Sequence, residues 1–330
     1  MKTKFYFVPL FIAIISSVGF AQTFYGRDPL AHTFSIVGRD SVTGDIGVAV
    51  QSHWFNVGSS VPWGEAGVGV VATQSFVNAS FGVRGLDLLK AGLTPQQVID
   101  SLLATDPGKD YRQLAVLDVD GRVASFTGSK CIEPAGNIVG NNFSVQANLM
   151  INNRVWPAMA EAFEKSKGPL SERMLAALEA AQKEGGDIRG KQSAAILVFK
   201  GKSTGKVWED KLIDLRVDDS ANPIKELSRL LKLHRAYEHM NNGDLAVEKN
   251  DMKLAMQEYS AAEKMFPANL EMKYWAAVAL ANNGKLDKAL PIFKKVFALD
   301  VNWKVLTPRL VLPGLLKVSK KELNEILSLP

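Results

Sequence analysis

The sequence predicts an α+β protein: a four-layer αββα sandwich, with two sheets between two layers of helices, followed by an all-α domain of helical repeats. Three observations predict this. From residue 33 to residue 217, segments with strand periodicity alternate with pairs of helical segments. Beyond residue 220 the apolar pattern is helical throughout. Within that helical part, similar residues recur at an interval of 34, the tetratricopeptide period.

Composition restricts the function classes. The chain has 330 residues, 47% hydrophobic and 22% charged, which is typical of a soluble globular protein of about two domains and excludes disordered, fibrous and multi-span membrane chains. The net charge of +5 is too small, and the basic residues too dispersed, to indicate nucleic-acid binding. A single cysteine, Cys131, excludes an internal disulfide and a cysteine zinc cluster. Without a metal or nucleotide motif, we expect no cofactor.

The N-terminus has the three parts of a secretory signal peptide. Lys2 and Lys4 precede an apolar stretch from residue 5 to residue 20, and Gly19-Phe20-Ala21 is a small-x-small cleavage site. We expect cleavage after Ala21, an exported protein in the periplasm or outside the cell, and no membrane association after cleavage. The alternative is an uncleaved anchor, for which the apolar stretch is somewhat short.

The first strands and helices follow from local pattern. Residues 33–37 and 45–52 alternate as strands around turn residues 43–45, and a glycine-rich apolar strand is expected at 67–76. Helices are expected at 85–91, ended by Gly92, and after Thr94-Pro95, an N-cap followed by a first-turn proline.

The second half of the sandwich repeats this order. Strands are expected at 113–117, 123–127 and 143–150, with Asp120-Gly121 as a turn. Helices are expected at 157–167 and 170–184, the latter ended by Gly185-Gly186. Closing strands are expected at 194–199 and 211–217. Each sheet then buries one face on the other sheet and one face on helices.

The turn-rich stretch 218–223 divides the sandwich from the helical part. The predicted domains are a signal peptide (1–21), a short leader (22–32), the sandwich (33–220) and the helical domain (221–330). Residues that correspond at the 34-residue interval support the repeat, and Pro267 stands at its terminal proline position; the pairs are Ala255 with Ala289, Tyr259 with Phe293, Ala262 with Val296, and Asn250 with Gly284. The alternative is an amphipathic helical bundle without repeats.

Thr33 is the candidate nucleophile. A threonine that becomes the first residue of a chain can use its own α-amine, whose reference pKa is about 7.7–8.0, to accept the hydroxyl proton. Such a site needs no histidine. It requires a threonine, serine or cysteine that opens a strand, and Thr33 opens one.

The segment Thr33–Asp40, Thr-Phe-Ser-Ile-Val-Gly-Arg-Asp, resembles the opening motif of the family called domain of unknown function 1028. The resemblance extends over about residues 33–200 and rests on further segments of the chain: Gly47–Ser52, Val57–Gly58, Val61–Trp63, Ala66–Gln74, Gly82–Gly85, Arg112–Leu114, Thr127–Gly128, Ala135–Gly136 and Gly185–Ala195. It implies a fold like that of the N-terminal-nucleophile hydrolases, which cleave amide bonds. In many relatives the matching threonine directly follows the initiator methionine. Here signal cleavage leaves Gln22 to His32 ahead of Thr33, so a second cut between His32 and Thr33 is required.

Three residues are assigned to the reaction. Thr33 is the nucleophile and, through its amine, the base. Asp40, with Arg39, orients that amine by charge-assisted hydrogen bonds, or the two form a surface ion pair at the turn. Asn148 donates to an oxyanion, or it satisfies backbone groups at the end of its strand.

The remaining candidates bind substrate. Ser52 and His53 end a neighbouring strand and line the cleft, or His53 is a packing histidine beside Trp54. Thr73 and Gln74 end the third strand and hydrogen-bond a substrate amide. Three residues before the last buried strand bind a substrate carboxylate or form a structural loop network, namely Asp187, Arg189 and Gln192.

Two functions from different classes follow. The first is an exported amide hydrolase of N-terminal-nucleophile type, acting on a small amide, a peptide or a cell-wall fragment. The alternative is a non-catalytic binding or assembly module, in which the helical repeats dock a protein or peptide partner in a concave groove with candidate aromatics Tyr237, Tyr274 and Trp275. A third interpretation gives the helical part a purely stabilising role. Homo-oligomerisation is left open.

Overall fold

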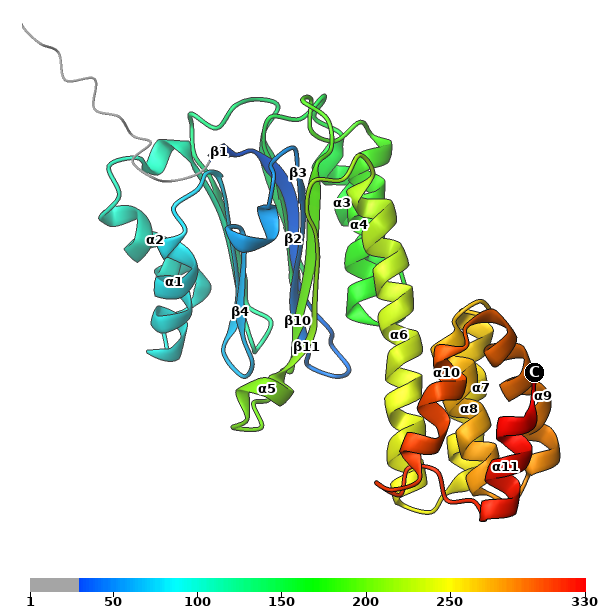
Figure 1. The fold of residues 1–330 in the computed structure, drawn as a ribbon. Coiled ribbons are helices and arrows are strands. Elements are labelled where there is room, and N and C mark those ends of the chain that lie inside the picture. Colours follow the sequence, from blue (N-terminus) through cyan, green and yellow to red (C-terminus); the bar gives the residue numbers. More distant parts are fainter. Residues whose placement is uncertain (1–29) are drawn as a thin grey trace, which may run out of the picture.

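The computed structural model describes residues 30–330. The predicted signal peptide and most of the leader therefore lie outside the described residues. The chain forms two antiparallel sheets with helices on their outer faces, and a helical C-terminal region that projects from one side (Figure 1). The prediction of a mixed α and β fold with a helical C-terminal part is confirmed.

The first sheet contains five strands in which β5 is central to the pairing. Its order is β1-β5-β6-β7, and β4 pairs with another part of β5. Their bounds are β1 Leu30–Ala31, β4 Pro62–Glu65, β5 Gly69–Phe76, β6 Arg112–Asp118 and β7 Val123–Thr127.

The second sheet contains six strands in the order β11-β10-β3-β2-β9-β8. Their bounds are β2 Thr33–Arg39, β3 Ile46–Ser52, β8 Gly136–Gly140, β9 Phe143–Ala147, β10 Ser193–Phe199 and β11 Lys211–Val217. Strands β2 and β3 form the predicted hairpin, with Thr33 opposite Ser52.

Alternating side chains build the two faces of each sheet. In β3, Val48 and Val50 join the apolar cluster between the sheets, whereas Ala49 joins the cluster under the helices. In β2, Val37 faces the other sheet, while Phe34 and Ile36 face the helices. Thr33 and Ser35 have the parity of Val37 and therefore face the space between the sheets.

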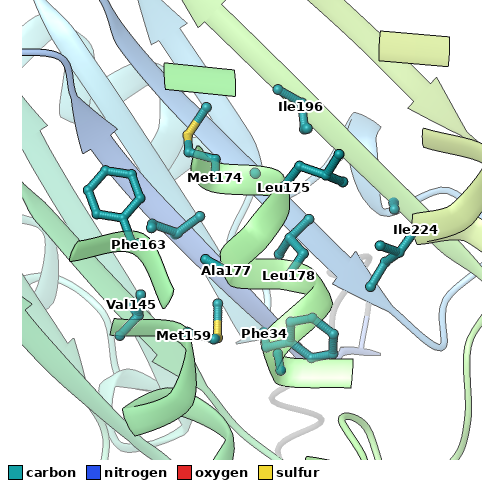
Figure 2. Packing of buried hydrophobic residues seen from close by; sticks show 14 of the residues in the cluster. Phe34, Val145, Met159, Phe163, Met174, Leu175, Ala177, Leu178, Ile196 and Ile224 are labelled. Carbon is teal, nitrogen blue, oxygen red and sulfur yellow. The ribbon is translucent and has the colours of Figure 1, made fainter. Parts of the chain in front are cut away.

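Helices cover both outer faces. Helices α1 (Ser80–Lys90) and α2 (Pro95–Ala104) pack on the first sheet, where the residues Thr94 and Gln97 form a capping box at the start of α2. Helices α3 (Val155–Lys165) and α4 (Leu170–Lys183) pack on the second sheet. Figure 2 shows this second interface, in which Met174, Leu175 and Leu178 of α4 lie over Phe34 and Ile196 of the sheet.

Helix α6 (Pro223–Glu248) connects the two parts of the chain. Its first turns contribute Ile224 and Leu227 to the core of the second sheet, and its later turns pack on α7. The helices of the C-terminal region are α7 Met252–Met265, α8 Leu270–Asn282, α9 Leu286–Leu299, α10 Asn302–Leu306 and α11 Lys320–Ser328; a short α5, Val207–Asp210, precedes β11. Within residues 30–330, no helix has the length and apolar character needed to cross a membrane.

Candidate functional site

Thr33 lies where the chain passes from one sheet to the other. It opens β2 in the second sheet and is completely buried. The two residues of β1 just ahead of it belong to the first sheet, where Leu30 pairs with Phe76 and Ala31 with Ser75. The peptide bond between His32 and Thr33 therefore lies between the sheets, at one end of the sandwich (Figure 1).

Two donors converge on the carbonyl oxygen of His32. Ser52 Oγ donates to it at 2.5 Å and Arg189 Nη2 at 2.8 Å. Arg189 is fixed by Asp187, whose buried carboxylate accepts from Nη2 at 2.7 Å and from Nε at 3.0 Å. Two fixed donors on one carbonyl oxygen are the arrangement that stabilises a developing oxyanion.

The hydroxyl of Thr33 is held beside that carbonyl. Thr33 Oγ1 donates to the carbonyl oxygen of Ala31 at 2.6 Å, and this hydrogen bond holds the hydroxyl in one direction. The carbonyl oxygen of Thr33 accepts from the backbone N–H of Asn148 at 3.1 Å and from Gln74 Nε2 at 3.3 Å. The backbone on both sides of Thr33 is therefore fixed by hydrogen bonds.

A buried amide network underlies the site. Gln74 Nε2 donates to Gln113 Oε1 at 2.7 Å, and Asn148 Nδ2 donates to the same oxygen at 2.9 Å. Ser35 Oγ donates to Gln74 Oε1 and receives a bond from Gln146 Nε2, each at 2.6 Å. A buried polar network in which each amide has partners rigidifies its surroundings, so the space between the sheets is apolar in its middle and polar at the Thr33 end.

His32 fills the remaining space at this end. Its Nδ1 lies 2.8 Å from Asn148 Oδ1, and its ring meets the ring of Phe76 edge-on, with centroids 5.4 Å apart. Burial lowers the pKa of His32, and the nearby positive Arg189 acts in the same direction. The imidazole is therefore neutral at pH 7, with its proton on Nδ1 facing the amide oxygen.

The lowered pKa of His32 makes the uncleaved chain sensitive to acid. Unfolding restores a pKa near 6.5, so the unfolded chain takes up the proton first, and stability falls as the pH decreases below about 6.5. We expect the uncleaved Thr33→Ala chain to lose more free energy of unfolding between pH 7.5 and pH 5 than the same chain carrying His32→Asn. The difference is at most about 1.4 kcal/mol per pH unit, the limit for one proton. Urea titrations at both pH values measure it, and equal losses in the two chains would contradict the assignment.

Arg39 and Asp40 lie at the wrong end of the strand for their predicted role. Strand β2 runs seven residues from Thr33 to Arg39, so both side chains lie about 20 Å or more from the Thr33 nitrogen. Asp40 accepts from the backbone N–H groups of Val42 and Thr43 in the hairpin turn, and Arg39 Nε donates to the carbonyl oxygen of Val119. Asp40 therefore stabilises the hairpin turn and Arg39 binds the neighbouring loop, and neither is placed to orient the nitrogen of Thr33.

Asn148 is at the site, but not as an oxyanion donor to His32. Its Nδ2 donates to Gln113 and, at 3.5 Å, to the carbonyl oxygen of Thr33, while its oxygen faces the His32 ring. The two donors on the His32 carbonyl are instead Ser52 and Arg189, to which the sequence assigned substrate binding.

Of the other substrate-binding candidates, some lie near Thr33 and others lie away from it. Gln74 faces the inter-sheet space, whereas Thr73 has the opposite parity on β5 and its hydroxyl donates to the carbonyl oxygen of Asn78. Asp187 accepts from the backbone N–H of His53, whose ring lies beside Gly190. The Gln192 side chain donates to Asp219, away from Thr33. Asp187 and Arg189 do form a loop network, and that network reaches the His32 carbonyl.

Sequence reasoning missed several residues of the site: His32, Phe76, Gln113 and Gln146. One signal was available, because Gln113 and Gln146 occupy inward positions of otherwise apolar strands, where a buried amide requires hydrogen-bond partners. His32 was assigned to the leader. Among the described residues, no cluster of three or more histidine, cysteine, aspartate or glutamate side chains is arranged to hold a metal ion.

In the helical region, the three aromatic candidates differ in their exposure. Tyr274 is completely buried against Phe293 and Trp303, so the prediction that it faces a groove is wrong. Trp275 lines a cavity of about 300 Å³ between α6, α7 and α8. Tyr237 is partly exposed, and its hydroxyl donates to Glu271.

Comparisons with known proteins agree with the resemblance in the sequence. A family model described as a family of unknown function, DUF1028, matches residues 33–227. The crystal structure of a DUF1028 protein from Silicibacter pomeroyi is 33% identical to this chain, with a TM-score of 0.55. That match covers 61% of this chain and 88% of the other. No curated protein matches the chain.

Proposed function

This chain belongs to the DUF1028 family of unknown function, and from that membership and the geometry around Thr33 we propose an exported amide hydrolase of N-terminal-nucleophile type. Thr33 is its nucleophile. Support for the fold type comes from the order of helices α1 and α2, two antiparallel sheets, and helices α3 and α4. That order corresponds to the αββα sandwich of such hydrolases.

The observation that carries the proposal is the environment of the His32–Thr33 peptide bond. Its carbonyl oxygen accepts two hydrogen bonds, from Ser52 and Arg189, and the hydroxyl of the next residue is held by a hydrogen bond to the carbonyl oxygen of Ala31. A buried strand-opening threonine with a purely structural role does not require a charged guanidinium on the preceding carbonyl. The same contacts are those that an intramolecular acyl shift requires.

The shift exposes the amine of Thr33. Thr33 Oγ1 attacks the carbonyl carbon of His32, the oxygen becomes an oxyanion held by Ser52 and Arg189, and the C–N bond breaks. The hydroxyl proton passes to the Thr33 nitrogen, which leaves as the amine, and His32 is then an ester on Oγ1. One water hydrolyses this ester to give a leader that ends in the His32 carboxylate and a chain that begins at Thr33.

The free amine then serves catalysis on other amides. It accepts the Thr33 hydroxyl proton near neutral pH as Oγ1 attacks the substrate carbonyl. Ser52 and Arg189 hold the oxyanion, the proton passes to the leaving amine, and water hydrolyses the resulting ester. Each cycle consumes one water and cleaves one C–N bond.

In the experiment, the purified full chain is incubated and its intact mass is measured at successive times. We expect a mass loss that corresponds to cleavage between His32 and Thr33, with a first-order rate that does not change over a hundredfold range of protein concentration. Cleavage whose rate rises with protein concentration would indicate a second molecule or a contaminating protease. No cleavage during days at pH 7–8 would contradict the proposal.

One observation favours a second function, docking of an extended peptide by the helical region. Helices α7 and α9 have equal lengths and start 34 residues apart, at Met252 and Leu286, which supports a tetratricopeptide-like arrangement. Asn282 binds the backbone of a segment of this chain's own tail. Its Nδ2 donates to the carbonyl oxygen of Leu315 at 2.9 Å, and its Oδ1 accepts from the N–H of Lys317 at 2.7 Å.

Asn282→Ala tests this docking mode. Without the side chain, the Lys317 N–H loses its acceptor, so we expect its hydrogen exchange to accelerate by about tenfold, the equivalent of one ordinary hydrogen bond. Asn283→Ala, at the next position of the chain, is the matched control. Unchanged exchange in Asn282→Ala would mean that the buried Leu316 alone holds the tail, and it would count against a peptide-clamping groove.

A further inference from the structure

We infer that the place now taken by the backbone of β1 (Leu30–Ala31) and by His32 is the acyl-side binding site for an extended peptide substrate, with a small residue followed by a residue whose planar side chain donates a hydrogen bond. This inference rests on the proposed function, because it treats the leader as the first substrate of Thr33. The leader residues occupy the positions that the acyl side of any later substrate must take, since Oγ1 attacks the carbonyl carbon that follows them.

The backbone of the leader binds as an added strand. β1 pairs antiparallel with Ser75 and Phe76 at the end of β5. β4 occupies the same edge of β5 further along, at Gly69–Ala72, so β1 and β4 pair with separate parts of this edge, and a substrate strand would take the part that β1 pairs with now. Pairing of an extended peptide with an exposed sheet edge is a common mode of peptide recognition. A small isolated amide has no extended backbone with which to make this pairing.

The backbone of this edge is locally strained. Ser75 has φ of +72°, a left-handed conformation that residues other than glycine rarely adopt. It lies directly opposite Ala31. Such outliers persist where the surrounding structure enforces them and are concentrated at ligand-binding positions.

The position of Ala31 admits a small side chain. Ala31 is completely buried in the apolar cluster between the sheets, together with Val57, Val61 and Val77. Protein interiors are close-packed, so a larger side chain here requires displacement of these neighbours. Alanine, glycine or serine is therefore expected at the second residue before the cleaved bond, directly ahead of the residue that takes the place of His32.

The position of His32 selects a hydrogen-bond donor. Asn148 Nδ2 is engaged by Gln113 Oε1, and Gln113 Nε2 donates in turn to the carbonyl oxygen of Ala147 at 2.9 Å. This polarity turns the amide oxygen of Asn148 toward the pocket, where it accepts from His32. A side chain without a donor leaves that buried oxygen unpaired.

Charge and shape restrict the position further. The guanidinium of Arg189 donates to the carbonyl oxygen of His32. It therefore repels a positively charged side chain at the His32 position. The ring of Phe76 packs edge-on against a planar group. Histidine, glutamine and asparagine meet all three requirements, whereas leucine lacks the donor and lysine carries the wrong charge.

The test uses the full chain after it has cleaved itself and been separated from its leader by gel filtration. The probes are acetyl-Leu-Ala-X-p-nitroanilides with histidine, glutamine, leucine or lysine at X, and kcat/KM is measured from released nitroaniline. We expect histidine and glutamine to exceed leucine and lysine by at least about tenfold. The second measurement is the rate of self-cleavage in variants of the chain itself. We expect His32→Gln to preserve this rate and His32→Leu to slow it by a similar factor.

The outcomes distinguish failure of the peptide site from failure of the proposed hydrolase. Hydrolysis of all four anilides at equal rates, or a preference for leucine or lysine, overturns the peptide site while leaving the hydrolase intact. A chain that begins at Thr33 but releases nitroaniline from none of the probes contradicts this peptide site, and its failure on a wider amide panel contradicts the hydrolase. A chain that keeps its leader contradicts both, because β1 then stays in its place.

Discussion

The Thr33→Ala chain is expected to remain uncut between His32 and Thr33 and to hydrolyse no amide. Under the proposed mechanism this substitution removes the attacking hydroxyl, so we expect a decrease on the order of 10⁴-fold or more in both rates. The fold should survive, because the substitution removes one hydrogen bond, from Oγ1 to the carbonyl oxygen of Ala31, a loss of about 1 kcal/mol. Intact mass over time measures the cleavage, and thermal unfolding measures the stability.

Two variants give this prediction its controls. Thr33→Ser keeps a hydroxyl in the same place and is expected to cleave at a measurable rate. Thr43→Ala removes an exposed threonine hydroxyl from the hairpin turn at the far end of β2 and is expected to behave as the wild type. Cleavage of the Thr33→Ala chain at the wild-type rate would assign the cut to an external protease.

Ser52→Ala is expected to slow self-cleavage by about 10²- to 10³-fold, the usual effect of removing one oxyanion donor. Ser52 Oγ donates at 2.5 Å to the His32 carbonyl, and the alanine variant leaves Arg189 as the second donor in place. The residual rate should therefore exceed that of Thr33→Ala. The measurement is the first-order rate constant from intact mass at pH 7.5.

Ser193→Ala is the matched control for Ser52→Ala. Ser193 lies directly opposite Ser52 on β10, is equally buried, and its hydroxyl donates to the carbonyl oxygen of Trp54 instead of to His32. Both variants lose one buried hydroxyl, so a stability effect alone would slow both equally. If the two variants cleave at the same rate, Ser52 has no role in the oxyanion site.

Much of the sandwich follows from local pattern. Alternation in β2 and β3 predicted the hairpin, and Thr94-Pro95 identified the start of α2. Strands β1, β4 and β8 were not predicted, and β1 lies in the predicted leader. β4 begins with a proline and β8 begins and ends with glycine, and short strands of this kind are specified by pairing with neighbours more than by their own residues.

The candidate site could be predicted only in part, because it is assembled by contacts distant in sequence. The choice of Thr33 rested on its position at the start of a strand and on the resemblance of residues 33–40 to the opening motif of the DUF1028 family. The convergence of Ser52 and Arg189 on His32 joins residues 20 and 157 positions apart, and it depends on the register of β2 with β3 and on the loop after α4. The error on Asp40 has the opposite cause. Asp40 is close to Thr33 in sequence, which suggested contact. In an extended strand, however, each residue adds about 3.3 Å, so the two ends of β2 lie far apart.

The N-terminal sequence of the protein recovered from expressing cells tests the central claim most directly. If Thr33 is the nucleophile of an N-terminal-nucleophile hydrolase, the mature chain begins with Thr33, and its intact mass corresponds to residues 33–330. The Ser52→Ala chain should show the longer precursor under the same conditions. A wild-type chain that begins at Gln22, or at any other residue ahead of Thr33, would contradict the account, because the Thr33 amine would then remain in a peptide bond.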